Sequence, residues 1–249
     1  MNSTMKKAIR TLQSEIPILK EAKDLFYYHM RRTFAVSHET DFKALRYLAP
    51  SRGKCFVDVG ANQGQSIESI LLARPGENIV SFEPNPPLAE NLARRYKKRE
   101  NVRVVGKGLS DSPGTFTLFV PCYKGFVYDG AASLNRKAAA SFINEKTVFR
   151  FDQTKLTISE VQCTVETLDA QNLSPAFIKL DVEGHEYNVL NGGRATLRQW
   201  APVLLIESFR SDPRTVQLTK ELRYQEYYFD GKALRKGSPT TSPNSYLLR

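Results

Sequence analysis

The chain has 249 residues, of which 41% are hydrophobic and 25% charged, a composition that excludes a globally disordered protein. Its formal net charge of +10 favours anionic partners. Three widely spaced cysteines without a C-x-x-C pair argue against a disulfide framework or a structural zinc site, and indicate a reducing compartment. No apolar run reaches the roughly 18–20 residues of a membrane-spanning helix, and no signal peptide is recognisable. We therefore expect a cytoplasmic protein without a transmembrane segment.

Residues 1–50 are expected to form a helical extension, because apolar residues recur there at three- and four-residue steps. Pro17 marks a kink or a break between two helices. Residues 37–41 have the character of a loop and cap before a second helix through Leu45 to Leu48. Two roles stay open for the extension: packing against its own domain, or pairing in a homodimer.

Residues 51–249 are expected to form one α/β domain, because strand-like and helix-like segments alternate from Cys55 onward. This alternation predicts a mostly parallel, twisted sheet with helices on both faces. Strands are expected at Cys55–Val59, Asn78–Phe82, Val102–Val105, Thr115–Val120, Val161–Val165, Ala176–Val182, Pro202–Ile206, Tyr224–Phe229 and Tyr246–Leu248. Helices are expected at Gln65–Ala73, Pro87–Arg99, after His185 and at Thr215–Leu222. Residues 121–155 interrupt the alternation of strands and helices and are interpreted as an insertion on the substrate side. Segments at such positions determine substrate choice in α/β folds.

The first strand leads into a glycine-rich turn. Asp58 stands near the end of this strand, and Gly60 and Gly64 follow before a helical pattern. Such a turn lets a ligand contact backbone and the N-terminus of a helix. The spacing is not the G-x-G-x-x-G that cradles a pyrophosphate, and Asp58 would repel phosphate but attract an ammonium or sulfonium. NAD is therefore a weaker candidate than a ligand without phosphate, and an ordinary turn without a ligand is the alternative.

Acidic residues follow several expected strands at the edge where parallel sheets bind their ligands. Glu83 lies one strand after Asp58, and a carboxylate there can accept both hydroxyls of a ribose. The two sites together predict a nucleoside with an amino-acid-like tail. S-adenosylmethionine is such a molecule.

The third candidate segment is Phe177–Glu186. Alternation places Lys179, Asp181 and Glu183 on one face of the expected strand, which implies a polar pocket. His185 follows at a helix start and is suited to accept a proton near neutral pH, although a capping role without chemistry is the alternative. Position 189 is Val, so the zinc motif H-E-x-x-H is excluded.

Taken in order, these segments resemble the FkbM-type methyltransferase family. The resemblance is carried by Val57–Gly64, Phe82–Pro86, Leu109–Asp111 with Gly114, Val165–Asp169, Ile178–Glu186, Val189-Leu190 and Gly192-Gly193. It runs from about Cys55 to Glu207, and residues 1–50 lie outside it.

The resemblance implies a class I, Rossmann-like fold and an S-adenosylmethionine-dependent O-methyltransferase. Carried over by motif, the residues for the methionine part of the donor would be Asp58, Gly60, Ala61, Asn62 and Gly64. Glu83 would hold the ribose, and Ser110 and Asp111 would lie near the adenine. Asp181, Glu183 and His185 would face the transferred methyl group.

A sugar hydroxyl is only weakly acidic, so its methylation needs a base or a metal. His185 is the first candidate base, with Asp181 orienting it or binding the acceptor. The alternative is Mg²⁺ held by Asp181, Glu183 and Glu207.

The leading prediction is methylation of a sugar or glycoconjugate hydroxyl, on an acceptor that is free, nucleotide-linked or lipid-linked. The alternatives are a polyketide or lipid acceptor, an RNA methyltransferase, a dinucleotide oxidoreductase, and a non-catalytic adaptor that docks through residues 1–50. Residues 94–99 are strongly basic but are interpreted as a solvated helix end. Without an RNA-binding signature, nucleic acid is not the expected partner.

Overall fold

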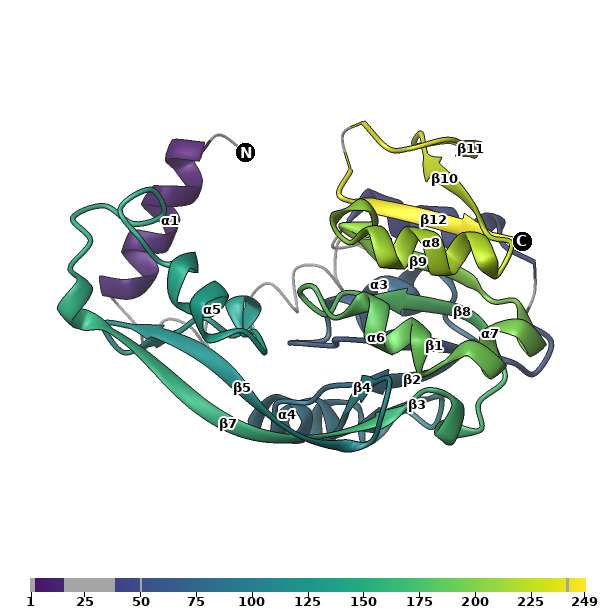
Figure 1. Ribbon diagram of the computed structural model, residues 1–249, viewed down its shortest axis with the longest axis horizontal. Helices are drawn as coiled ribbons and strands as arrows, with labels where there is room; N and C mark the ends of the chain where they lie inside the picture. The colour runs from purple at the N-terminus through teal and green to yellow at the C-terminus, as the bar shows by residue number, and fades with distance from the viewer. Residues whose placement is uncertain (1–2, 16–38, 50, 241) are drawn as a thin grey trace. The chain divides into compact units, whose positions relative to one another are not determined.

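The computed structural model describes residues 3–15, 39–49, 51–240 and 242–249 (Figure 1). The described residues fall into two units, one within Met1–Phe34 and Phe116–Gln162 and the other within Ala35–Thr115 and Cys163–Arg249. The expected break at Pro17 lies outside the described residues.

The second unit is built on an eight-stranded sheet with the order β11-β10-β12-β9-β8-β1-β2-β3. Its strands are β1 (Cys55–Val59), β2 (Asn78–Phe82), β3 (Val102–Val105), β8 (Pro175–Leu180), β9 (Val203–Glu207), β10 (Gln225–Phe229), β11 (Leu234–Lys236) and β12 (Asn244–Leu248). The five strands from β9 to β3 pair in parallel. Strands β10, β11 and β12 form an antiparallel edge. The expected mostly parallel sheet is confirmed.

Helices cover both faces of this sheet because its strands are apolar on both sides. Along β1, Phe56 belongs to the core under one set of helices and the next residue, Val57, to the core under the other set. The first set comprises the 3₁₀ helix η1 (Thr40–Tyr47), α3 (Gln65–Ala73) and α4 (Pro86–Tyr96). The second set comprises α6 (Glu186–Asn191), α7 (Arg194–Trp200) and α8 (Pro213–Glu221).

The sequence did not predict α7 or the short strand β4 (Gly108–Ser110), because seven and three residues are too few to display a period. The structure explains the glycines between α6 and α7. A Cβ on Gly192 would lie 2.0 Å from the carbonyl oxygen of Ser110. Only glycine therefore lets α6 pack this closely on β4.

The first unit joins the N-terminal helix α1 (Ser3–Glu15) to the segment interpreted as an insertion. Tyr128 Oη donates to the carbonyl oxygen of Arg10 at 3.2 Å, and the N–H of Phe149 donates to Thr11 Oγ1 at 2.9 Å. The described part of residues 1–50 thus makes contacts within its own chain, and a homodimer stays a prediction.

The remaining elements lie in or beside this segment, except for η4 and η5, which belong to the larger unit. They are β5 (Gly114–Tyr123), β6 (Phe126–Val127), α5 (Arg136–Phe142), β7 (Leu156–Thr167) and the 3₁₀ helices η2 (Asp129–Ala131), η3 (Gln153–Lys155), η4 (Asp169–Gln171) and η5 (Phe209–Ser211). Strands β4, β7, β5 and β6 form a second sheet in that order.

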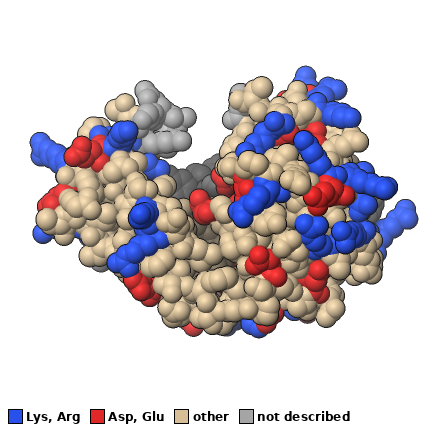
Figure 2. Space-filling view, in the orientation of Figure 1, with Lys and Arg blue, Asp and Glu red and all other residues tan. Residues whose placement is uncertain are grey.

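The described helices include none that is both long and apolar enough to cross a membrane. Arg94 and Arg95 occupy the last turn of α4, where cations complement the helix dipole. Figure 2 shows Lys and Arg side chains scattered over the visible face, with Asp and Glu between them.

Candidate functional site

The loop after β1 is a tight turn that packs between β8 and α4. Gly60 and Gly64 have φ angles of +86° and +87°, which favour glycine. A Cβ on Gly60 would lie 1.9 Å from the carbonyl oxygen of Asp181, and one on Gly64 would lie 2.9 Å from Leu92 Cδ2. Backbone conformation and close packing thus favour glycine at both positions, and their contact with a ligand stays a prediction. The buried Ala61 fixes the loop to the core beneath it.

Glu83 connects this loop to the loop after β2. Its Oε2 accepts the N–H of Asn62 at 2.6 Å and its Oε1 accepts the N–H of Asn85 at 2.9 Å. The residue is only 5% exposed. Glu83 thus holds the loop after β1 and the loop after β2 together through its two carboxylate oxygens.

Asp58 lies beneath the loop and has no exposed surface. Its Oδ2 accepts a hydrogen bond from Ser81 Oγ at 2.8 Å, and its Oδ1 lies 3.9 Å from Lys179 Nζ. Burial raises the pKa of Asp58, and the charge of Lys179 opposes that shift. Asp58 is thus enclosed by the protein with Lys179 beside it, and its expected role toward the methionine part of a donor stays a prediction.

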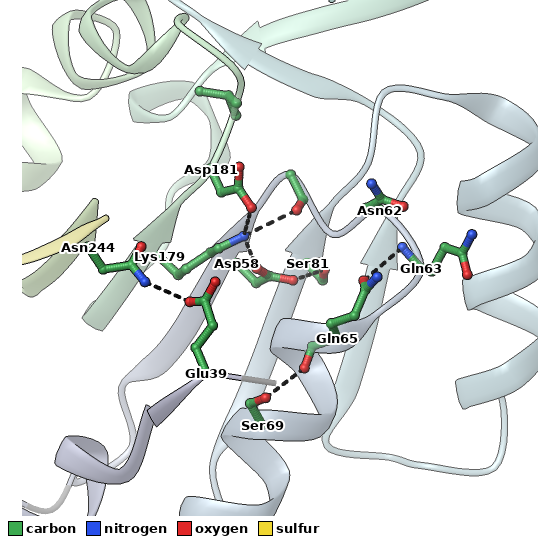
Figure 3. A network of polar contacts seen from close by, with 12 residues as sticks. Glu39, Asp58, Asn62, Gln63, Gln65, Ser69, Ser81, Lys179, Asp181 and Asn244 are labelled. Carbon is green, nitrogen blue, oxygen red and sulfur yellow. Dashed lines mark hydrogen bonds and ion pairs between the residues drawn. The ribbon is translucent and has the colours of Figure 1, made fainter. Parts of the chain in front are cut away.

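Lys179 is the centre of the polar network in Figure 3. Its Nζ lies 2.9 Å from Asp181 Oδ2 and 3.4 Å from the carbonyl oxygen of Gly60. Burial alone would lower the pKa of Lys179, but the charges of Asp181 and Asp58 raise it, so the ammonium stays charged. Exposure increases outward, from a side-chain value of 0% for Asp58 to 8% for Lys179 and 33% for Asp181. Of these three charged residues, Asp181 is therefore the one that a ligand can reach.

Two residues from the ends of the chain join the same network. Glu39 Oε2 accepts a hydrogen bond from Asn244 Nδ2 at 2.7 Å, and Asn244 is the β12 residue paired with Glu207 of β9. The pKa of Glu207 is raised to about 8 by burial, by a hydrogen bond with Asp181 and by the charges of Asp181 and Glu39. Carboxyl groups from three segments thus meet beyond the ends of β8 and β9.

His185 forms a second network with residues after β4. Its Nε2 lies 2.9 Å from Ser110 Oγ, and Ser110 Oγ donates to Asp111 Oδ1 at 3.2 Å. Asn188 Nδ2 donates to Asp111 Oδ2 at 2.9 Å. His185 is the N-cap residue of α6, but its side chain makes no capping hydrogen bond. Burial lowers the pKa of His185 and the charge of Asp111 opposes this, so the imidazole is neutral near pH 7.

The loop between β8 and α6 has an unusual backbone. Glu183 is exposed and has a φ of +50°, a conformation that is uncommon for residues other than glycine. Glu186 Oε1 accepts the N–H groups of Val182 and Gly184 at 3.3 and 3.2 Å. Glu186 thus fixes the loop that presents Asp181, Glu183 and His185.

No group of three or more His, Cys, Asp or Glu side chains in the described part of the chain is arranged to hold a metal ion. Asp181, Glu183 and Glu207 do not form a ligand set here, and Mg²⁺ stays a prediction.

Around Lys179, the sequence analysis did not identify Ser81, Glu39 and Asn244 as site residues. The sequence contains one indication of Ser81, which is a polar residue within the otherwise apolar core of strand β2. The sequence contains no indication of Glu39 or Asn244, because tertiary folding brings them together from opposite ends of the chain.

Comparison with known proteins identifies the family. The sequence model of the Methyltransferase FkbM domain matches residues 58–229. The 2-O-methyltransferase NoeI of Sinorhizobium fredii (strain NBRC 101917 / NGR234) is 24% identical over 144 residues, which cover 57% of this chain and 58% of NoeI. The chain thus spans little more than half the length of this curated relative.

Among solved structures, a methyltransferase FkbM from Methylobacillus flagellatus KT has a TM-score of 0.51 and 18% identity, over 84% of this chain and 48% of that chain. This likeness supports the fold, which is the Rossmann-like fold of class I methyltransferases. The match to the family covers more than half of the chain and includes the loops after β1, β2 and β8. The chain therefore belongs to the FkbM methyltransferase family.

Proposed function

We propose that this protein is an S-adenosylmethionine-dependent O-methyltransferase that acts on a hydroxyl group of a sugar or glycoconjugate. The observation that carries the donor assignment is the hydrogen bond from Asn62 to Glu83, which joins the glycine-rich loop to a recessed carboxylate. A helix N-terminus beside such a carboxylate suits a ligand with both an amino-acid tail and a ribose.

The residues present fit this donor. The N-cap residue of α3, Gly64, supplies no side-chain hydrogen bond, which leaves the first turn of the helix to an anionic group such as a carboxylate. Glu83 supplies a carboxylate, the group whose two oxygens match the two hydroxyls of a ribose. Asp58 and Asp181 contribute negative charge near a cationic sulfur and ammonium, with Lys179 between them. Ser110 and Asp111, assigned to the adenine by resemblance, stay candidates for that contact.

When bound, S-adenosylmethionine supplies a methyl group on a cationic sulfur, whose bond to carbon breaks as the acceptor oxygen bonds to that carbon and the hydroxyl proton leaves to a base. His185 is the base that we propose, because its imidazole is neutral and is oriented by Ser110. Lys179 Nζ lies 2.9 Å from Asp181 Oδ2 and fixes this side chain in place, which suits Asp181 to hold the acceptor hydroxyl. Glu183 lies in the same loop and can contact either partner.

A hydroxyl-rich acceptor suits the groups beyond β8 and β9. Glu39, Asp181 and Glu207 supply carboxyl groups and Asn244 supplies an amide, the side chains that bind hydroxyls best. The name of NoeI, a 2-O-methyltransferase, agrees with an oxygen acceptor. A polyketide or lipid hydroxyl is the alternative, and residues 121–155 are the segment expected to decide between them.

Calorimetry of S-adenosylmethionine binding tests the donor assignment. We expect micromolar binding to the intact protein and a loss of at least about tenfold in Glu83→Ala, because that substitution removes charge-assisted hydrogen bonds to the ribose. Glu221→Ala removes a carboxylate from the surface of α8 and is the matched control, with unchanged binding expected. Absence of binding to the intact protein would contradict the proposed function and would favour a non-catalytic adaptor.

A further inference from the structure

Asn85 carries a buried oxygen atom that nothing in the described protein satisfies. The residue is 4% exposed, and its Oδ1 has no hydrogen-bond partner. Buried side-chain oxygens almost always have a partner, and leaving one without a partner costs about 1–3 kcal/mol. The position of Asn85 therefore requires an explanation that the folded chain alone does not provide.

The ordinary role of an asparagine at this position is helix capping, and Asn85 does not perform it. Asn85 is the N-cap residue of α4, yet its side chain makes no capping hydrogen bond. An N-cap side chain accepts hydrogen bonds from the N–H groups of the second and third helical residues. Pro87 at the second position of α4 has no N–H, and the side chain of Asn85 accepts no hydrogen bond from Leu88 at the third position. The side-chain oxygen of Asn85 is thus available for another partner.

The surroundings of Asn85 indicate which partner this is. Its own N–H donates to Glu83 Oε1 at 2.9 Å, so Asn85 is in direct contact with the carboxylate proposed to hold a ribose. The other oxygen of that carboxylate fixes Asn62 in the glycine-rich loop. A ligand whose hydroxyls reach Glu83 would bring a hydrogen-bond donor beside Asn85.

We propose that Asn85 Oδ1 accepts a hydrogen bond from a ribose hydroxyl of the methyl donor, so that Glu83 and Asn85 together recognise the diol. This inference rests on the proposed function and adds a residue to it. A carboxylate and an amide then share the two hydroxyl groups, and the ligand satisfies the oxygen that the protein leaves without a partner.

The stability of the ligand-free protein distinguishes a ligand-binding role of Asn85 from a structural one. Removal of a structural hydrogen bond destabilises the free protein, whereas removal of an unsatisfied buried group does not. We therefore expect Asn85→Ala to unfold at the same temperature as the wild type, or at a higher one, when no ligand is present. The increase in unfolding temperature caused by S-adenosylhomocysteine should be smaller in the variant.

Calorimetry with matched ligands tests the contact itself. S-adenosylhomocysteine is compared with its 2′-deoxy and 3′-deoxy analogues, and with S-inosylhomocysteine, which lacks the adenine amino group. We expect Asn85→Ala to bind S-adenosylhomocysteine about tenfold more weakly, and to bind one deoxy analogue as tightly as the wild type does, because the lost contact is the same. Asn91→Ala, on the same helix, is the control and should bind all four ligands as the wild type does.

Each other result has a defined meaning. Equal affinity of wild type and Asn85→Ala for S-adenosylhomocysteine would overturn the proposal, and would assign the oxygen to a buried water molecule. An equal loss for every ligand would also overturn it, because no ribose hydroxyl would be coupled to Asn85. A coupling confined to S-inosylhomocysteine would assign Asn85 to the adenine instead. If the wild type binds none of these ligands, the proposed function itself fails.

Discussion

Lys179 and Asp181 form the ion pair that joins the interior of the sheet to its ligand-binding edge. The ammonium lies 2.9 Å from Asp181 Oδ2, and behind it the buried Asp58 lies 3.9 Å away. A buried lysine between two carboxylates is stabilising only as a set, because removal of the cation leaves two negative charges uncompensated. The pair therefore couples the stability of the fold to the geometry of the site.

We predict that Lys179→Met lowers the free energy of unfolding by about 3–5 kcal/mol, the usual cost of breaking a buried ion pair. Urea denaturation measures this loss. The double variant Lys179→Met/Asp58→Asn should recover part of it, because the most deeply buried charge is then removed as well. Lys220→Met, at an exposed position of α8, is the control and should change stability little. A single variant as stable as the wild type would contradict this account.

The glycine-rich loop yields a prediction that separates backbone strain from steric collision. Gly60 and Gly53 have nearly the same φ, +86° and +84°, but only Gly60 has a neighbour that a Cβ would meet, the carbonyl oxygen of Asp181 at 1.9 Å. Gly60→Ala should therefore lose several kcal/mol of stability, or fail to fold, whereas Gly53→Ala should lose about 1–2 kcal/mol from strain alone. Thermal denaturation of the two variants checks this. Equal losses would mean that the loop can move away from β8.

The sequence predicted the central strands and the glycine-rich turn correctly because local patterns determine them. Strand β1 and helix α3 have the expected ends, since an apolar run and two glycines mark them. The sequence could not reveal that Asp58 is wholly buried, because a single acid in a strand has the same pattern whether it faces a ligand or a lysine. That distinction depends on Lys179, on a neighbouring strand.

The polar partners of the site were harder to predict than its strands. The sequence analysis assigned Ser110 to the adenine and His185 to the transferred methyl group, and in the structure their side chains lie 2.9 Å apart. Packing of α6 on β4 brings them together, and this packing requires the missing side chain of Gly192. Contacts of this kind, like that between Glu39 and Asn244, follow from tertiary structure and leave no periodic signal in the sequence.

Glu207 should make stability depend on pH in a specific window. Its pKa is raised from 4.5 to about 8 in the folded protein, so between these values the native state holds a proton that the unfolded state has lost. This contribution to stability is complete below pH 4.5 and is lost as pH rises toward about 8. Glu207→Gln mimics the protonated group, so its stability relative to wild type should increase from about pH 5 to about pH 9. Urea denaturation at both pH values checks this, with Glu221→Gln as the control. A stability difference between Glu207→Gln and the wild type that does not vary with pH would contradict the raised pKa of Glu207.

The Mg²⁺ alternative predicts a different response. If Asp181, Glu183 and Glu207 hold a metal during catalysis, EDTA should abolish methyl transfer to a sugar acceptor, and added Mg²⁺ should restore it. If His185 is the base, transfer should persist in EDTA. Measurement of radiolabelled methyl transfer in both conditions distinguishes the two mechanisms.

His185 gives the last prediction, because its burial and its neighbours act in opposite directions. Burial lowers the pKa of the imidazole below 6.5 and Asp111 raises it. Asp111→Asn should therefore lower the pKa of His185 further. The ring signals of His185, identified among the three histidines by their absence in His185→Asn, report this shift in NMR spectra recorded across the pH range.

Because the folded pKa of His185 is depressed, stability should fall as pH drops below about 6.5, and His185→Asn should remove that dependence. A base that stays neutral should also sustain methyl transfer below pH 6.5, whereas His185→Ala should lose at least about a hundredfold in turnover. Near-normal turnover of His185→Ala would exclude the imidazole as the base and would assign the proton to Asp181.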